Sequence, residues 1–177
     1  MAVAVVTIQA PLYRDGAGIP NHLERANLLW AHLEEANLHD VNLKGADLRG
    51  AHLQKAEIWT THPEGAHLKG VNLQGTATVM SHLEGADLSE AHLEGASLGS
   101  VSLEGTDLRG THLDKVSLGG TNLQGAKNIT VKQLSTVRTL YQAQLDKPLL
   151  EQIQQQYPQL LEEEKIQFLP PWETSKE

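Results

Sequence analysis

The sequence of 177 residues contains no cysteine and very few aromatic residues. The absence of cysteine excludes disulfide bonds, thiolate metal sites and a cysteine nucleophile. Because aromatics make up only 4% and Phe168 is the single phenylalanine, an apolar core must be built from leucine and alanine. No apolar run is long enough to cross a bilayer, and the N-terminal stretch lacks the basic region of a secretory signal. We therefore expect a cytoplasmic protein that does not associate with membranes.

Positive charge is also scarce, with 14 Lys and Arg against 22 Asp and Glu and a net charge of -8. Direct binding to nucleic acid is not expected, because it relies on clustered Lys and Arg side chains that release counterions. The sequence also lacks a glycine-rich phosphate loop and a nucleophile elbow. These absences predict a protein that is not an enzyme and uses no cofactor.

A five-residue repeat runs through the middle of the sequence. Every fifth residue from 23 to 123 gives 21 positions, of which 18 are leucine and the others are Ile58, Pro63 and Thr78. A small residue lies two positions before the leucine, and glycine is frequent two positions after it. Residues two apart share one face of an extended segment, and glycine favours turns with positive φ. The pattern predicts short extended pieces joined by turns, wound in stacked rungs around an apolar axis.

Pentads such as ANLHD, VNLKG, ADLRG and TDLRG resemble the A(D/N)LXX motif of the pentapeptide-repeat family, and the resemblance covers residues 21–126 without an insertion. It implies an all-β solenoid, a right-handed quadrilateral β-helix with four pentads per coil. The leucine and the small residue would point inward and the other residues outward. The 21 pentads would form about five coils, each advancing by about one strand spacing of 4.8 Å.

The period changes after residue 126, where we expect two helices. Thr130 and Gln133 fit a capping box that starts the first helix. A second helix is expected to start near Asp146 and to stop at Pro158. The apolar residues of these expected helices are Leu134, Val137, Tyr141, Leu145, Leu149, Leu150 and Ile153.

Three segments follow from these patterns: an N-terminal cap segment (1–20), the repeat β-helix (21–126), and a C-terminal helical cap with its tail (127–177). A solenoid end exposes core leucines and unpaired backbone, so a helical cap has a structural reason. The solenoid end or the C-terminal helices could also pair two chains in a homodimer, and this interpretation does not exclude the cap.

With four pentads per coil, residues 20 apart would stack in columns. Eight of the nine histidines share one repeat position, so His32 should lie over His52 and His92 over His112. Two imidazoles with a nearby carboxylate suit zinc or nickel. Structural zinc needs a closed tetrahedral ligand set, however, and an open column offers none, so we predict no metal site. Stacked imidazoles should instead repel one another below about pH 6.5.

Residues 21–126 carry 14 acidic against 7 basic side chains, including a column of Glu64, Glu84 and Glu104. A solvated acidic surface explains this excess simply. Some members of the family protect DNA gyrase by mimicking duplex DNA, and the resemblance offers that role as an alternative function. The sequence lacks the central phenylalanines and projecting loops of those members, and Arg49 and Arg109 offset neighbouring acidic residues.

One apolar patch interrupts the polar columns. The two irregular pentads, around Ile58 and Thr78, are predicted to be stacked neighbours, and the patch consists of Trp59, Ala77, Val79 and Met80. Exposed apolar patches often mark contacts, although a chain terminus or a local bulge would also account for these residues. We predict a non-enzymatic protein-interaction module that binds one or more protein partners.

Overall fold

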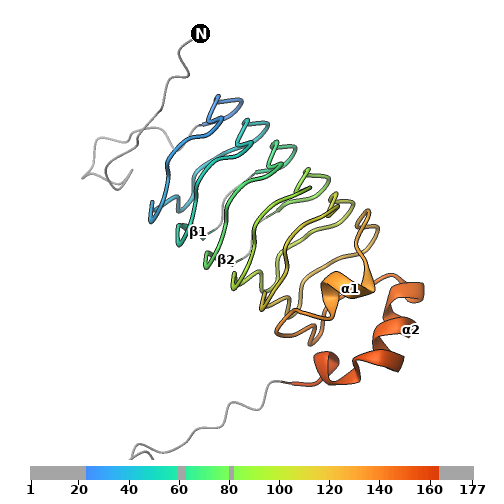
Figure 1. The fold of residues 1–177 in the computed structure, drawn as a ribbon. Helices are drawn as coiled ribbons and strands as arrows, with labels where there is room; N and C mark the ends of the chain where they lie inside the picture. The colour runs from blue at the N-terminus through green and yellow to red at the C-terminus, as the bar shows by residue number, and fades with distance from the viewer. Residues whose placement is uncertain (1–22, 60–62, 80–81, 164–177) are drawn as a thin grey trace, which may run out of the picture.

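The repeat region forms a coil that stacks on itself with a register of 20 residues. The computed structural model describes residues 23–59, 63–79 and 82–163. In the column that begins at His32, parallel bridges join His32 to His52, His52 to Asn72, Asn72 to His92 and His92 to His112. The turns of chain therefore lie side by side as a rod (Figure 1). The predicted column register is confirmed.

Backbone hydrogen bonding explains why the repeat has five residues. The N–H of Leu28 donates to the C=O of Asp47 in the next coil, and the N–H of Asp47 donates back to Ala26. A turn closes each pentad, as where the N–H of Ala31 donates to the C=O of Leu28. Trp30, the third residue of that turn, has a φ of +58°, which is the conformation that makes glycine frequent at this position.

The asparagine or aspartate that precedes the leucine accepts a hydrogen bond from a backbone N–H of its own pentad. The N–H of Leu29 donates to Oδ1 of Asn27 at 3.2 Å, and the N–H of Lys44 donates to Oδ1 of Asn42 at 3.0 Å. These short side chains accept a bond from the backbone two residues on, as in an Asx turn. The motif thus provides a partner for a backbone donor that the coil-to-coil ladder does not use.

The core is an axial stack of leucines with small residues between them. Leu38, Leu48, Leu88 and Leu108 are completely or almost completely buried. Threonine at the small position buries its hydroxyl by bonding to backbone, as Thr111 does to the C=O of Leu88 at 2.8 Å. A buried hydroxyl needs such a partner, which explains how threonine substitutes for alanine here.

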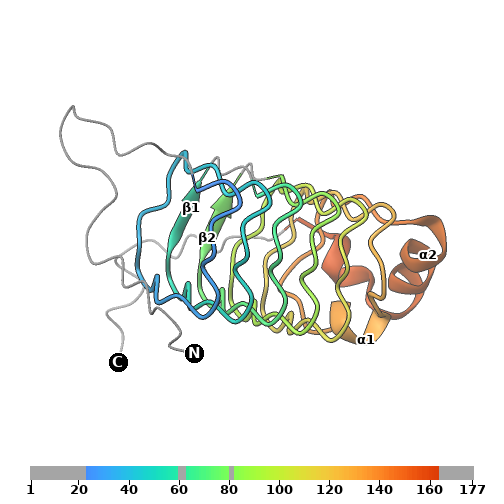
Figure 2. The ribbon, with the colours of Figure 1, turned by 90° about the horizontal axis from the view of Figure 1, so that it is seen from above.

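Regular strand geometry is confined to the two irregular pentads in the described part of the chain. Strand β1 (Glu57–Trp59) and strand β2 (Ala77–Val79) pair in parallel, with Trp59 opposite Val79 (Figure 2). Ile58 is buried like the leucines, and Pro63 is also buried at its central position. The predicted stacking of the two pentads is confirmed.

The prediction of a long first C-terminal helix is mostly wrong. Helix α1 (Val131–Leu134) has only four residues, and the predicted capping box is present at Thr130. Beyond it the chain returns to the coil path: Thr139 pairs with Ser117 and Gln144 with Asn122, a register of 22 residues.

Three residues assigned to the first helix, Val137, Tyr141 and Leu145, therefore lie on a further turn of the coil. The N–H of Arg138 donates to the C=O of Val116, and the N–H of Gln144 donates to that of Thr121. The unpaired edge of the preceding coil offers these hydrogen bonds, which outweigh a weak helical spacing.

The expected second helix is present as α2 (Lys147–Gln156), with Asp146 as its N-cap residue. It is followed by the 3-10 helix η1 (Pro158–Leu161). Both lie at the C-terminal end of the stacked coils in Figures 1 and 2. No helix in the described ranges has the length and apolar character needed to traverse a membrane.

Candidate interaction surfaces

The predicted apolar patch lies on the face that carries β1 and β2. The bridges run from Asn37 to Glu57, on to Ala77, then Ser97 and Ser117. Ala77 is half-buried. The side chains of Trp59 and Val79, and the whole of Met80, lie outside the described part of the structure. The backbone therefore agrees with the predicted column, while the patch itself stays a prediction.

Further along the same face, the chain presents glycines and small side chains such as Ser97 and Ser117. Gly99 and Gly119 do not occupy the positive-φ position of the turn, and an added Cβ at either would meet its nearest atom at 3.7 Å, an ordinary contact. Neither backbone conformation nor crowding therefore requires glycine there. Their presence keeps this part of the face flat.

Sequence reasoning missed an exposed tryptophan, Trp30, at the turn that follows Leu28. Its side chain is 56% exposed, and it is the only large hydrophobic residue so exposed in the described part of the chain. The ring lies directly over Gly50, where an added Cβ would clash with it. The detectable signal was an aromatic residue at the turn position directly followed, one coil later, by glycine.

Trp30 borders an open groove along one corner of the rod. The groove is lined by Leu29, Trp30, Arg49, Gly50, Lys69, Gly70 and Glu90. Gly50 and Gly70 leave its floor without side chains, and Lys69 forms an ion pair with Glu90 at 3.2 Å. The groove combines an aromatic ring with a charged rim, a composition found at protein contacts.

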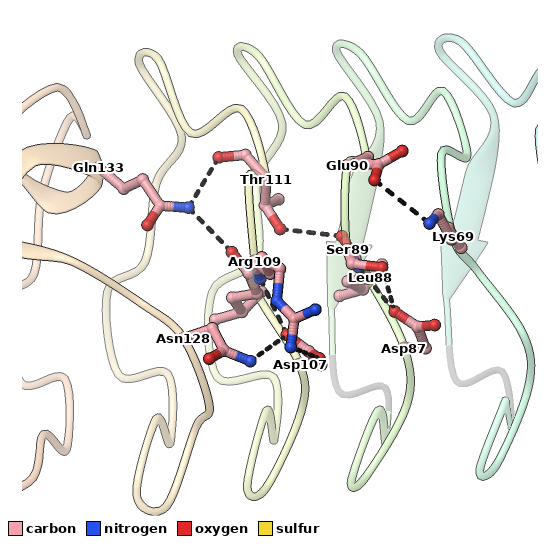
Figure 3. A network of polar contacts seen from close by, with 11 residues as sticks. Lys69, Asp87, Leu88, Ser89, Glu90, Asp107, Arg109, Thr111, Asn128 and Gln133 are labelled. Carbon is pink, nitrogen blue, oxygen red and sulfur yellow. Dashed lines mark hydrogen bonds and ion pairs between the residues drawn. The ribbon is translucent and has the colours of Figure 1, made fainter.

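Acidic residues beside this groove are paired with the cations next to them. Arg49 contacts both carboxylate oxygens of Asp47, at 2.7 and 2.6 Å. The Arg49 side chain holds the pKa of Asp47 below its usual value, although partial burial opposes this. Asp107 accepts a hydrogen bond from Asn128 and lies 3.6 Å from Arg109 (Figure 3). The hydrogen bond from Asn128 is the main reason that the pKa of Asp107 is lowered.

The predicted histidine stacks are present. The rings of His32 and His52 have centroids 4.8 Å apart and planes 6° apart, and those of His92 and His112 are 4.6 Å and 7° apart. His82, in a different column from these stacks, lies 3.0 Å from the carboxylate of Glu84, and this hydrogen bond raises the pKa of His82. His32 and His92 likewise contact the carboxylate of their own pentad, as the His-x-Glu spacing implies.

Sequence comparison identifies the repeat. Eight copies of the motif described as pentapeptide repeats match residues 22–59, 65–105 and 91–127, more than half of the chain. The chain belongs to the pentapeptide-repeat family. The fold of this family is a right-handed β-helix, in agreement with the coil and its parallel register. No curated protein sequence matches the chain significantly.

Solved pentapeptide-repeat structures resemble this chain. HetL, involved in heterocyst differentiation regulation in the cyanobacterium Nostoc sp. strain PCC 7120, is 28% identical with a TM-score of 0.59 over 70% of this chain and 55% of HetL. Rfr23 from the cyanobacterium Cyanothece 51142 is 21% identical, with a TM-score of 0.43 over 73% of this chain and 90% of Rfr23. QnrB1, a plasmid-mediated fluoroquinolone resistance protein, is 16% identical with a TM-score of 0.34 over 75% of this chain and 72% of QnrB1. This pentapeptide-repeat chain thus spans about half the length of HetL.

The C-terminal apolar residues predicted to cap the rod or to pair two chains pack largely within the single chain. Leu134, Val137, Leu145 and Ile153 are buried. Tyr141, Leu149 and Leu150 are half-buried, and the two leucines pack against the core. Little of this apolar set is therefore left for a second copy, and a homodimer through these helices stays a prediction.

Proposed function

We propose that this pentapeptide-repeat protein is a non-enzymatic, cytoplasmic module that binds a protein partner, and that its binding surface is the Trp30 groove. The exposure of Trp30 is the observation that carries the proposal. Trp30 is the one large apolar residue left exposed in the described part of the chain, at 56%, and this exposure costs hydration free energy unless a partner covers the ring.

The groove has the features of a contact centre. Tryptophan and arginine are enriched among the residues that dominate binding energy at protein interfaces, and here Trp30 and Arg49 line the same groove. The ring of Trp30 covers Gly50, whereas Gly70 has no heavy atom near its missing side chain and lets a partner approach the backbone closely. The ion pair of Lys69 with Glu90 holds one side of the rim, so the groove has its shape before the partner arrives.

The remainder of the fold supports this role as a rigid scaffold of about five coils with a helical C-terminal cap. Ile153 of α2 and Leu160 of η1 are buried, and the N–H of Leu140 donates to the C=O of Leu160 at 2.6 Å. A cap of this kind blocks the edge of the last coil, which would otherwise invite pairing with another chain.

DNA mimicry directed at gyrase is the second candidate, favoured by the acidic excess of the repeats. Ion pairs weaken the case for DNA mimicry, because Arg49 and Arg109 lie against Asp47 and Asp107 and reduce the negative electrostatic field of that column. A gyrase supercoiling assay with added protein separates the candidates. We expect no change in supercoiling at micromolar protein, and inhibition or protection would establish the mimic.

The test of the Trp30 groove compares two substitutions at equivalent turn positions. Trp30→Gly removes the ring and relieves a positive φ, so it should not unfold the protein. Lys55→Gly does the same at a φ of +60° on another column, with a side chain that is 74% exposed. Partners captured from the native cell by the unaltered chain should be lost with Trp30→Gly and kept with Lys55→Gly.

Two controls accompany this experiment. Light scattering of each variant tells whether the groove binds a second copy of the chain, and a variant without residues 1–20 tells whether the protein's own N-terminus occupies it. Capture that is equal for both glycine variants would contradict the proposal.

A further inference from the structure

One group of side chains, in and beside the column that begins at His32, brings three metal-ligating residues together. His92 and His112 come from adjacent coils, held in register by their bridge. Nδ1 of His92 lies 3.3 Å from Oε1 of Glu94, and Nδ1 of His112 lies 4.0 Å from the same oxygen. The ligand atoms of all three residues lie within 4.8 Å of one another. One carboxylate oxygen therefore faces two imidazole nitrogens.

The neighbouring coil holds this carboxylate in place. Nε2 of Gln74 donates to the other oxygen, Oε2 of Glu94, at 3.1 Å. That bond fixes the carboxylate plane and leaves Oε1 directed to the rings. Partners of this kind orient the ligands in metal sites. Partial burial favours the neutral acid, but the backbone N–H of Glu94 and the side chains of Gln74 and His92 lower its pKa on balance.

We propose that His92, Glu94 and His112 bind one divalent transition-metal ion of the zinc type. Two imidazole nitrogens and one carboxylate oxygen are a zinc ligand set, which leaves a fourth position for water or a partner's side chain. Imidazole selects such ions over calcium and magnesium, which prefer oxygen ligands. The open face that argued against a closed structural site is compatible with this three-ligand arrangement.

The required rearrangement is small. Zinc–ligand bonds of about 2.0–2.1 Å bring tetrahedral ligand atoms to about 3.3 Å from one another, so both rings must turn toward Glu94. The side chains of His92 and His112 are 43% and 52% exposed and can turn without moving the backbone.

The chain contains its own control in the other stacked pair. His32 and His52 have nearly the same ring separation, and Glu34 contacts His32 at 2.9 Å. Within the ranges that the structure describes, however, only His92, Glu94 and His112 place three ligand atoms this close. The same molecule therefore provides a stack of two histidines without the three-ligand arrangement, and this stack serves as the control.

The experiment titrates tag-free full-length protein with zinc chloride by calorimetry in a buffer without chelators. We expect one zinc ion per chain. A double variant, His92→Asn with His112→Asn, should bind at least tenfold more weakly. It should still fold, because Asn72 occupies the same column position between the two pairs. Glu94→Gln should also weaken binding, whereas His32→Asn with His52→Asn should not.

Thermal melts of each variant without metal confirm that it is folded, and magnesium chloride serves as the control for a general effect of divalent charge. The proposal is overturned if the unaltered protein takes up no zinc or if it binds magnesium as tightly. It is also overturned if the His92 and His112 double variant binds like the unaltered protein, or if the His32 and His52 double variant loses zinc equally.

Discussion

Two glycines four residues apart, Gly95 and Gly99, allow backbone strain to be measured apart from side-chain packing. Gly95 is the third residue of its turn and has a φ of +70°, and an added Cβ would have no heavy atom within 4 Å. Gly99 lacks a positive φ, and its added Cβ would lie 3.7 Å from the C=O of Gly119, an ordinary contact. Alanine therefore fits the available space at both positions but suits the backbone at only one.

We expect Gly95→Ala to lower the free energy of unfolding by about 1–2 kcal/mol, the cost of the left-handed conformation for a residue with a Cβ. Gly99→Ala should leave that free energy unchanged or raise it by up to about 1 kcal/mol, because alanine restricts the unfolded chain. Gly95→Asn should fall between the two, since asparagine tolerates the left-handed region.

Urea denaturation followed by circular dichroism measures these differences, provided that unfolding is reversible and the dependence on urea concentration is the same for each variant. The free energies of the two alanine variants should differ by at least about 1 kcal/mol. Equal values would refute the reasoning, because they would mean that the turn geometry does not decide which residue is tolerated.

Three further predictions concern the polar contacts of the coil. Asn122→Ala removes the acceptor for the N–H of Gln124, bonded at 3.0 Å, and should lower the free energy of unfolding by about 0.5–1.5 kcal/mol in the same urea assay; no change would show that water replaces this bond fully. Thr121→Val should change the free energy of unfolding by less than about 1 kcal/mol, because the C=O of Leu98, which accepts the Thr121 hydroxyl, also accepts the backbone N–H of Val101. A loss above about 2 kcal/mol would contradict this expectation. The pKa of Asp47 is lowered in the folded state, so the stabilisation that it gives is complete above its ordinary pKa of 3.8 and is lost as the pH falls through the folded value. Melting temperatures measured between about pH 6 and pH 2.5 should therefore fall less steeply for Asp47→Asn than for the unaltered protein, and parallel curves would show that the contact with Arg49 contributes nothing.

Local residue choice made most of the solenoid predictable. Leucine every five residues with a small residue two positions earlier defines the buried face, and glycine marks the turn. The resemblance to a family supplied four pentads per coil, and from it the columns that correctly placed His92 over His112 and Trp59 opposite Val79. Periodicity failed after residue 134, where the apolar spacing fits a helix and a coil turn with two extra residues equally well.

The candidate sites were less predictable because they depend on side-chain direction. Column arithmetic brought two histidines and a carboxylate near one another, but it did not show that one oxygen of Glu94 faces both rings. That arrangement depends on Gln74, which lies one coil away and binds the other oxygen. Trp30 was not singled out, because its exposure and its position over Gly50 follow from the corner geometry of the turn.

The sequence by itself determined the repeat, its buried face and its turn positions, because each pentad meets its backbone and packing needs with five adjacent residues. Only the tertiary structure decided where the chain departs from that rule. The return of residues 136–145 to the coil is one such decision, since the edge of the preceding coil supplies hydrogen bonds that a local pattern does not reveal. The convergence of His112 on His92 and Glu94 is another, since it requires two adjacent coils to lie in register, and Gln74 of a third coil holds the carboxylate.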